Sequence, residues 1–147
     1  MKTINQVLKE KGSEIWATTP NKLVIDALQV MADKDIGALL VMDGEKLVGI
    51  FSERDYARKV ILKGKSSKEL AVREVMSSHI YYITPDITCE QALALMTQKH
   101  VRHLPVLDGN KLIGVVSIGD LVKAVIAQQK QVIDRLEKHI LETTSIT

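Results

Sequence analysis

The chain of 147 residues is poor in aromatic side chains and has only one cysteine. Aromatic residues make up 3% of it, and the basic residues are interspersed with acidic ones. This composition does not favour a nucleic-acid partner, which needs stacking rings and a basic stripe. The single cysteine, Cys89, excludes an intramolecular disulfide, so nothing in the composition points to an oxidising compartment.

Long hydrophobic runs are also missing. The longest unbroken apolar stretches, such as Ala38 to Met42, are far below the roughly 20 residues that span a bilayer. The N-terminal segment MKTINQVLKEKG lacks the continuous apolar stretch of a secretory signal. The formal net charge is +2, and no block of five or more like charges occurs. We therefore expect a cytoplasmic protein without a membrane partner.

The groupings that enzymes and metal sites require are absent from the sequence as well. His100 and His103 have no accompanying cluster of acidic residues or cysteines that would complete a metal site. Cys89 has no His or acidic motif beside it that would mark a nucleophile, and no paired carboxylates share a turn. We therefore expect no enzymatic activity, no catalytic residue and no metal.

An internal repeat is the most informative feature that is present. Residues 20–60 align without a gap with residues 85–125, and 15 of the 41 positions are identical. Each copy is too short for an independent enzyme, so the pattern favours two small units that bury apolar surface together. The predicted division is a first repeat at 3–64, a second repeat at 65–128, and a C-terminal helix extension and tail at 129–147.

The same order of elements is predicted in both copies: helix, strand, helix, strand, strand, helix. A Thr-Pro pair ends the first strand of each copy, because the residue before proline prefers an extended conformation. An Asp-Gly pair between apolar runs then indicates a hairpin. The first helices are predicted at 3–11 and 68–76, and extending the same alignment to them matches Val7 with Val72. The strands are predicted at 15–18, 38–42 and 47–51 in the first copy, and at 80–83, 104–107 and 112–116 in the second.

A long amphipathic helix is predicted from residue 118 to Leu141. At about 1.5 Å per residue it would extend roughly 36 Å, which is more than one repeat needs. One interpretation is a helix that lies across its own module, and another is a helix that also makes a dimer contact. The apolar stripe consists of Leu121, Val122, Val125, Ile126, Val132, Ile133, Leu136 and Ile140.

Both copies carry the motif Gly-x-x-Ser-x-x-Asp at the turn from strand to helix, with the Ser-Asp pairs Ser52/Asp55 and Ser117/Asp120. Ser-x-x-Asp before an apolar helix is a capping signature, in which the serine accepts a backbone N–H. A helix N-terminus is also a site for phosphate, and an acidic side chain can accept both hydroxyls of a ribose. The pattern alone is compatible with caps and with a nucleotide site.

The cationic side chains differ between the copies. Arg54, beside the first motif, offers a fork of donors for phosphate, and the second copy has Gly119 there. The second copy instead has Arg and His at 102–103, where the first has Gly37 and Ala38. This asymmetry predicts two related pockets of unequal affinity or one shared pocket. Arg102 as a solvated strand end and His103 as a hydrogen-bonded core or edge residue remain open alternatives.

The ordered motifs resemble a tandem pair of cystathionine beta-synthase (CBS) domains, a Bateman module, over about residues 3–128. The phrase Val-Arg-His-Leu-Pro-Val at 101–106 is typical of the second domain of such pairs. The resemblance implies an α/β (α+β) fold of two βαββα repeats related by a pseudo-twofold axis. It further implies small sheets that face a central cleft, extra N- and C-terminal helices, and a homodimer.

The resemblance also implies AMP or another adenosine ligand (ATP, NAD(H) or S-adenosylmethionine) in that cleft, with the two aspartates on the ribose. The implied function is a stand-alone regulatory module that signals energy or redox state to an unknown protein partner. The alternative is a structural dimerisation adaptor whose motifs are caps only. The implied nucleotide-binding residues are Thr19, Ile36, Gly37, Ala38, Ser52, Arg54, Asp55, Thr84, Arg102, His103, Pro105, Ser117 and Asp120.

Overall fold

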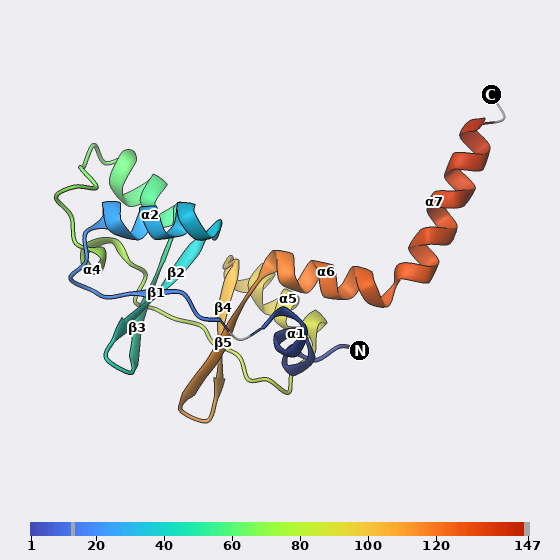
Figure 1. Ribbon diagram of the computed structural model, residues 1–147, viewed down its shortest axis with the longest axis horizontal. Coiled ribbons are helices and arrows are strands. Elements are labelled where there is room, and N and C mark those ends of the chain that lie inside the picture. Colours follow the sequence, from blue (N-terminus) through green and yellow to red (C-terminus); the bar gives the residue numbers. More distant parts are fainter. Residues whose placement is uncertain (13, 146–147) are drawn as a thin grey trace. The chain divides into compact units, whose positions relative to one another are not determined.

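A computed structural model describes residues 1–12 and 14–145, and of residues 131–133 and 141–145 it describes the backbone only. The chain forms two compact units (Figure 1). The first unit consists of residues 14–81. The second unit consists of residues 82–145 together with the N-terminal residues 1–12. Both units mix helices with a small sheet, so the predicted mixed α/β fold class is confirmed.

The first unit is built on a three-stranded sheet in the order β1-β2-β3. The strand β1 runs parallel to β2, and β2 pairs with β3 in an antiparallel hairpin. Gly44 has a φ of 62°, which the tight turn between the hairpin strands requires and which glycine adopts without strain. The elements are β1 (Ala17–Thr18), α2 (Val24–Lys34), β2 (Ala38–Asp43), β3 (Lys46–Ser52), α3 (Glu53–Tyr56), the π-helix η1 (Ala57–Ile61) and α4 (Val72–Val75).

The core of the first unit lies between this sheet and its helices. Its fully buried side chains come from α2, β2, β3, η1 and α4, and include Val24, Val41, Phe51, Val60 and Val72. The helix α4 is shorter than the predicted helix at 68–76, because Ala71 before it is extended and pairs with Leu23, and because the chain becomes extended again at Met76. The next residue then exchanges two backbone hydrogen bonds with β3, which a longer helix would prevent.

The second unit repeats this hairpin in β4 and β5. The register of β4 against β5, including an irregularity in the middle of β4, reproduces that of β2 against β3. The predicted strand at 80–83 is reduced to a single parallel bridge between Ile83 and Val106. The elements of this part of the chain are α5 (Cys89–Lys99), β4 (His103–Asp108), β5 (Lys111–Ser117), α6 (Ile118–Gln128) and α7 (Lys130–Ser145).

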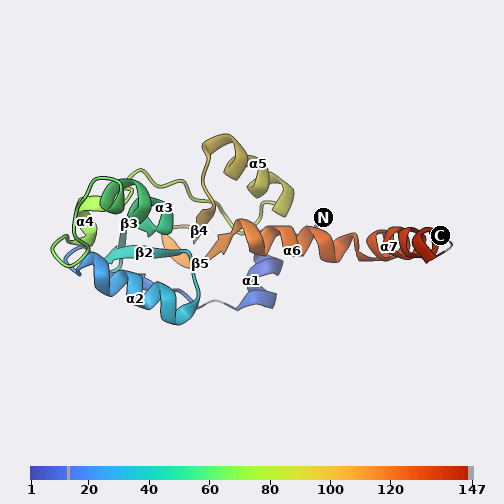
Figure 2. The same cartoon turned by 90° about the horizontal axis from the view of Figure 1, so that it is seen from above.

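The N-terminal helix α1 (Ile4–Lys11) belongs to the second unit and not to the first, although the predicted first repeat at 3–64 includes it. It lies beside α6 (Figures 1 and 2). Its apolar face, Ile4, Val7 and Leu8, is buried. The compact units therefore cut the chain differently from the sequence repeats at 3–64 and 65–128, because α1 buries its apolar side chains in the unit that contains the second hairpin.

The helices α1 and α4 occupy equivalent places in the two units. The N–H of Ile4 donates to the carbonyl of Ile87, and the N–H of Val72 donates to that of Lys22. The two acceptors, Lys22 and Ile87, are matched positions of the repeat, so the structural counterpart of Val72 is Ile4. The predicted match of Val72 with Val7 is wrong, because these helices are shifted along the chain relative to the hairpins.

The predicted helix from 118 to Leu141 is interrupted at Gln129, which separates α6 from α7 (Figure 1). The φ and ψ of Gln129 are −97° and 8°, and its N–H is shared between two preceding carbonyls, so the regular helix ends there. The side chains of Val132 and Ile133 and the segment 146–147 lie outside the described residues. Within the part of the chain that the structure describes, no helix is long and apolar enough to cross a membrane.

Candidate functional site

The first Ser-Asp corner, formed by Gly37, Ser52 and Asp55, lies where β3 leads into α3. The hydroxyl of Ser52 accepts the N–H of Asp55 at 3.2 Å, and the N–H of Ser52 donates to the carboxylate of Asp55 at 2.9 Å. The N–H of Glu53 donates to the carbonyl of Gly37 at 3.0 Å. The corner is therefore a capping box that closes the first turn of the helix.

The carboxylate of Asp55 is almost completely enclosed, with 8% of the residue exposed. Besides the hydrogen bond from the Ser52 N–H, it accepts hydrogen bonds from the hydroxyls of Ser52 and Ser77, each at 3.0 Å. It also forms an ion pair with Lys59 at 3.1 Å. Lys59 also donates to the carbonyl of Val75. Both oxygens of Asp55 are thus held by donors of its own unit.

The second Ser-Asp corner, formed by Arg102, Ser117 and Asp120, lies at the N-terminus of α6. The N–H of Ser117 donates to Oδ2 of Asp120 at 2.8 Å, and the N–H of Asp120 donates to the Ser117 hydroxyl at 3.1 Å. The N–H of Ile118 donates to the carbonyl of Arg102 at 2.9 Å. His103 stands opposite Ser117 in the β4–β5 ladder, at the edge of the same corner.

Lys11, at the end of α1, completes the second corner. Its Nζ lies 2.6 Å from Oδ2 of Asp120 and 2.8 Å from the carbonyl oxygen of Val115, and it donates to both. The side chain of Lys11 is 33% exposed and that of Asp120 is 23% exposed. The second aspartate is therefore held by one cation from another helix and remains partly open to water.

The charges of the second corner shift two pKa values. Burial alone would raise the pKa of Asp120, but hydrogen bonds from Lys11 and Ser117 and the charge of Lys11 outweigh it and lower the pKa. The pKa of His103 is lowered, mainly by burial and then by the positive charge of Lys11, which the negative charge of Asp120 opposes. His103 is therefore a neutral imidazole at pH 7.

We expect NMR titration of the His103 ring in the ligand-free protein to give a pKa below 6.5. Substituting Lys11→Met should move this pKa upward, because the substitution removes a cation that opposes protonation. Since the folded pKa is depressed, the contribution of His103 to stability is complete above about pH 6.5 and is lost as the pH falls. A His103 pKa that does not respond to Lys11→Met would contradict this electrostatic description.

The other predicted ligand residues are distributed less compactly. Ala38 pairs with Ser52 at the first corner. Ile36 donates its N–H to the carbonyl of Met31 and Arg54 lies on α3, both close to that corner in sequence. Pro105 lies in the middle of β4, where its carbonyl accepts the N–H of Ile83.

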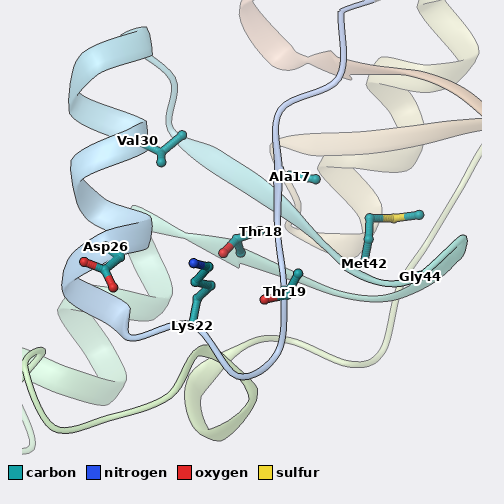
Figure 3. Close-up of a pocket in the computed structure, with 8 residues that line it drawn as sticks. All are labelled: Ala17, Thr18, Thr19, Lys22, Asp26, Val30, Met42 and Gly44. Carbon is teal, nitrogen blue, oxygen red and sulfur yellow. The ribbon is translucent and has the colours of Figure 1, made fainter.

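Thr19 lies at the opposite end of its sheet from the first corner, because β1 runs parallel to β2 and reaches the Gly44 end of the hairpin. There it lines a hollow of about 440 Å³ together with Thr18, Lys22 and Asp26 (Figure 3). Thr84 follows Ile83, which is bridged to Val106, so it occupies the corresponding end of the second hairpin. Neither threonine is brought to the Ser-Asp corner of its own unit.

Sequence reasoning missed three residues that contact the two aspartates: Lys11, Lys59 and Ser77. Lys59 follows Asp55 by four residues on one helical segment, and this spacing could have indicated the pair. The other two reach their aspartates from distant segments, so no local pattern marks them. Among the side chains that the structure describes, no group of three or more His, Cys, Asp or Glu could hold a metal ion.

Residues 13–62 and 72–127 each match the family model described as the CBS domain. The chain belongs to the CBS domain family. The resemblance inferred from the repeated motifs is therefore confirmed, and the chain is a tandem CBS pair. It is 38% identical, over 94% of its length and 71% of the relative, to the mitochondrial CBS domain-containing protein CBSX3 of Arabidopsis thaliana.

Solved structures of CBS pairs agree with this membership. A CBS-domain protein from Burkholderia ambifaria is 52% identical, with a TM-score of 0.84 over 87% of this chain and 96% of that one. The CBS domain pair of protein MJ0100, solved with 5′-methylthioadenosine and S-adenosyl-L-methionine, has a TM-score of 0.76 over 87% of this chain and 98% of that one. Its identity is 19%, so it shows a shared fold.

Proposed function

We propose that this CBS pair binds an adenosine-containing ligand, such as AMP, ATP, NAD(H) or S-adenosylmethionine, at the second Ser-Asp corner. Asp120 would accept the ribose hydroxyls, and the N-terminus of α6 beside Ser117 would face a phosphate or another polar group. The observation that carries the proposal is the partly exposed carboxylate of Asp120, whose cationic partner is a movable side chain. The adenosine compounds bound to the MJ0100 pair support this ligand class.

The two corners differ in how available their aspartates are. Asp55 is 8% exposed and already accepts donors on both carboxylate oxygens. A ligand at the first corner would have to displace several buried contacts, whereas at Asp120 it would exchange with the Lys11 contact alone. We therefore assign the primary site to the second corner and a weaker one to the first.

The regulatory role is the further part of the proposal. Ligand that binds one conformation better than another shifts the population of the two, and a partner protein can respond to that shift. The α6 side chains Ile118, Val122 and Ile126 are exposed, and so are Leu136 and Ile140 of α7. These apolar groups support a homodimer or a contact with a partner protein. A dimerisation adaptor without a ligand is the alternative, and a cytoplasmic location stays a prediction.

Titration calorimetry on protein freed of bound nucleotide, with AMP, ATP, NADH and S-adenosylmethionine, tests the proposal. We expect saturable binding of at least one of them. Asp120→Asn should weaken that binding by about tenfold or more, because an amide cannot act as a charged double acceptor for two hydroxyls. Asp108→Asn, at the exposed hairpin turn, is the matched control and should bind like the wild type.

An absence of heat and of thermal shift with all four compounds would overturn the ligand assignment. The adaptor alternative would then remain, with both Ser-Asp motifs acting as helix caps. Equal losses of affinity in the Asp108 and Asp120 variants would instead show that the effect is one of general charge rather than of contact with the sugar.

A further inference from the structure

At equivalent places of the two Ser-Asp corners, different residues donate hydrogen bonds to the aspartate and to the carbonyl of the preceding strand. In the first unit, Ser77 donates its N–H to the carbonyl of Ile50 at 2.8 Å and its hydroxyl to Asp55 at 3.0 Å. In the second unit, the Nζ of Lys11 donates to Val115 at 2.8 Å and to Asp120 at 2.6 Å. Val115 is the counterpart of Ile50 in the repeated hairpin. One lysine side chain therefore makes both contacts that a backbone amide and a hydroxyl make in the other unit.

Because of this difference, the Lys11 contacts at the second corner are easier to break than the Ser77 contacts at the first corner. The Ser77 contact includes a reciprocal pair of backbone hydrogen bonds with Ile50, so releasing it requires the chain itself to move. Lys11 has a long, rotatable side chain that is one-third exposed, and its ammonium group can transfer to water without any movement of the backbone. An ion pair with this much solvent contact is weak enough to exchange with a ligand.

The chemistry of Asp120 indicates what would compete with Lys11. Oδ2 of Asp120 accepts both the Ser117 N–H and the Lys11 ammonium group. A ribose that places one hydroxyl on each oxygen of the carboxylate needs a lone pair of Oδ2, and the Ser117 N–H and Lys11 already use that oxygen. We propose that Lys11 occupies part of the sugar position in the ligand-free protein, so that ligand binding displaces it. This inference rests on the proposed function, because it concerns the same corner.

Displacement of Lys11 would change how α1 is held. The beginning of the helix is fixed by the Ile4 N–H to the Ile87 carbonyl, and its middle is fixed by Leu8, which packs directly against Gly114. The last turn is held to the corner by the side chain of Lys11, and the helix ends at Gly12, whose N–H donates to Leu8. The chain then continues into the other unit. Occupancy of the corner is thereby transmitted to the last turn of α1.

Calorimetric titration of three variants with AMP, ATP, NADH and S-adenosylmethionine tests the competition. Lys11→Met should bind the ligand about fivefold more tightly than the wild type, because the sugar no longer exchanges with a weak ion pair. Lys11→Arg should remain close to the wild type, since it retains charge and reach. Lys9→Met, an exposed position on the same helix, is the control and should leave the affinity unchanged.

Unchanged or weaker binding by Lys11→Met would overturn the inference. If Lys11→Met bound more weakly and Lys11→Arg bound like the wild type, Lys11 would be a ligand contact rather than a competitor. An absence of binding by the wild type to all four compounds would overturn the proposed function itself and the Lys11 inference with it. Binding by the wild type therefore separates a failure of the competition from a failure of the site.

Hydrogen exchange provides a second readout on the intact chain. The amide of Gly12 should exchange several-fold faster once the wild type is saturated with the ligand that binds, because the last turn of α1 loses its side-chain contact. In Lys11→Met this amide should exchange fast without ligand and should not respond further. Ligand binding by the wild type with unchanged exchange at Gly12 would contradict the transmission to α1.

Discussion

Replacing Ile4 by alanine should lower the free energy of unfolding of the second unit, formed by residues 1–12 and 82–145, by about 3 kcal/mol. Ile4 is completely buried, and its backbone N–H donates to Ile87 of the same unit. The substitution removes three carbon atoms and leaves a cavity that the surrounding side chains fill only in part. Hydrogen exchange in urea should show reduced protection of β4 and β5, with β2 and β3 unchanged.

Val72→Ala is the matched control for this experiment. Val72 is the structural counterpart of Ile4 and is also completely buried, but in the unit of residues 14–81. It should cost about 2 kcal/mol and reduce protection in β2 and β3 only. The boundaries at residues 64 and 65 lead to the opposite assignment, with Ile4 in the first repeat and Val72 in the second. Loss of protection in β2 and β3 on Ile4→Ala would contradict the assignment of α1 to the second unit and of α4 to the first.

The parts of the fold that depend on local pattern could be predicted from the sequence. Both hairpins lie around the Asp-Gly pairs, since glycine at a positive φ and flanking apolar runs determine such turns. Both Ser-x-x-Asp motifs begin helices as capping boxes, because the bonds join residues three positions apart. The repeat also places corresponding residues of the two hairpins in the same register.

The parts that depend on distant contacts could not be predicted. The equivalence of α1 with α4 is visible only in the hydrogen bonds of Ile4 and Val72 to distant carbonyls. The apolar residues Val7 and Val72 coincide in the alignment that matches the strands, although the two helices are shifted along the chain relative to those strands. Lys11 reaches Asp120 across 109 positions, and no pattern in a single sequence specifies such a contact.

Asp55→Ala should reduce the free energy of unfolding of its unit by about 3 kcal/mol, as measured by urea denaturation of the ligand-free protein. The carboxylate accepts the N–H and the hydroxyl of Ser52, the hydroxyl of Ser77 and the ammonium group of Lys59. Alanine leaves these donors without their acceptor in a place that water reaches poorly. Lys59→Met, in which only the cation is lost, should cost much less because that side chain is 43% exposed.

Asp120→Ala is the decisive comparison. This substitution should lower the free energy of unfolding by about 1 kcal/mol. Its donors, which include the Ser117 N–H and Lys11, lie where water can replace the carboxylate, so the penalty of unpaired groups is small. Equal costs at the two positions would contradict the division of roles between the corners. If the costs differ as expected, the same duplicated motif stabilises one unit through a saturated aspartate. In the other unit it leaves an aspartate whose partner can be exchanged, and a site that binds and releases a ligand requires such a partner.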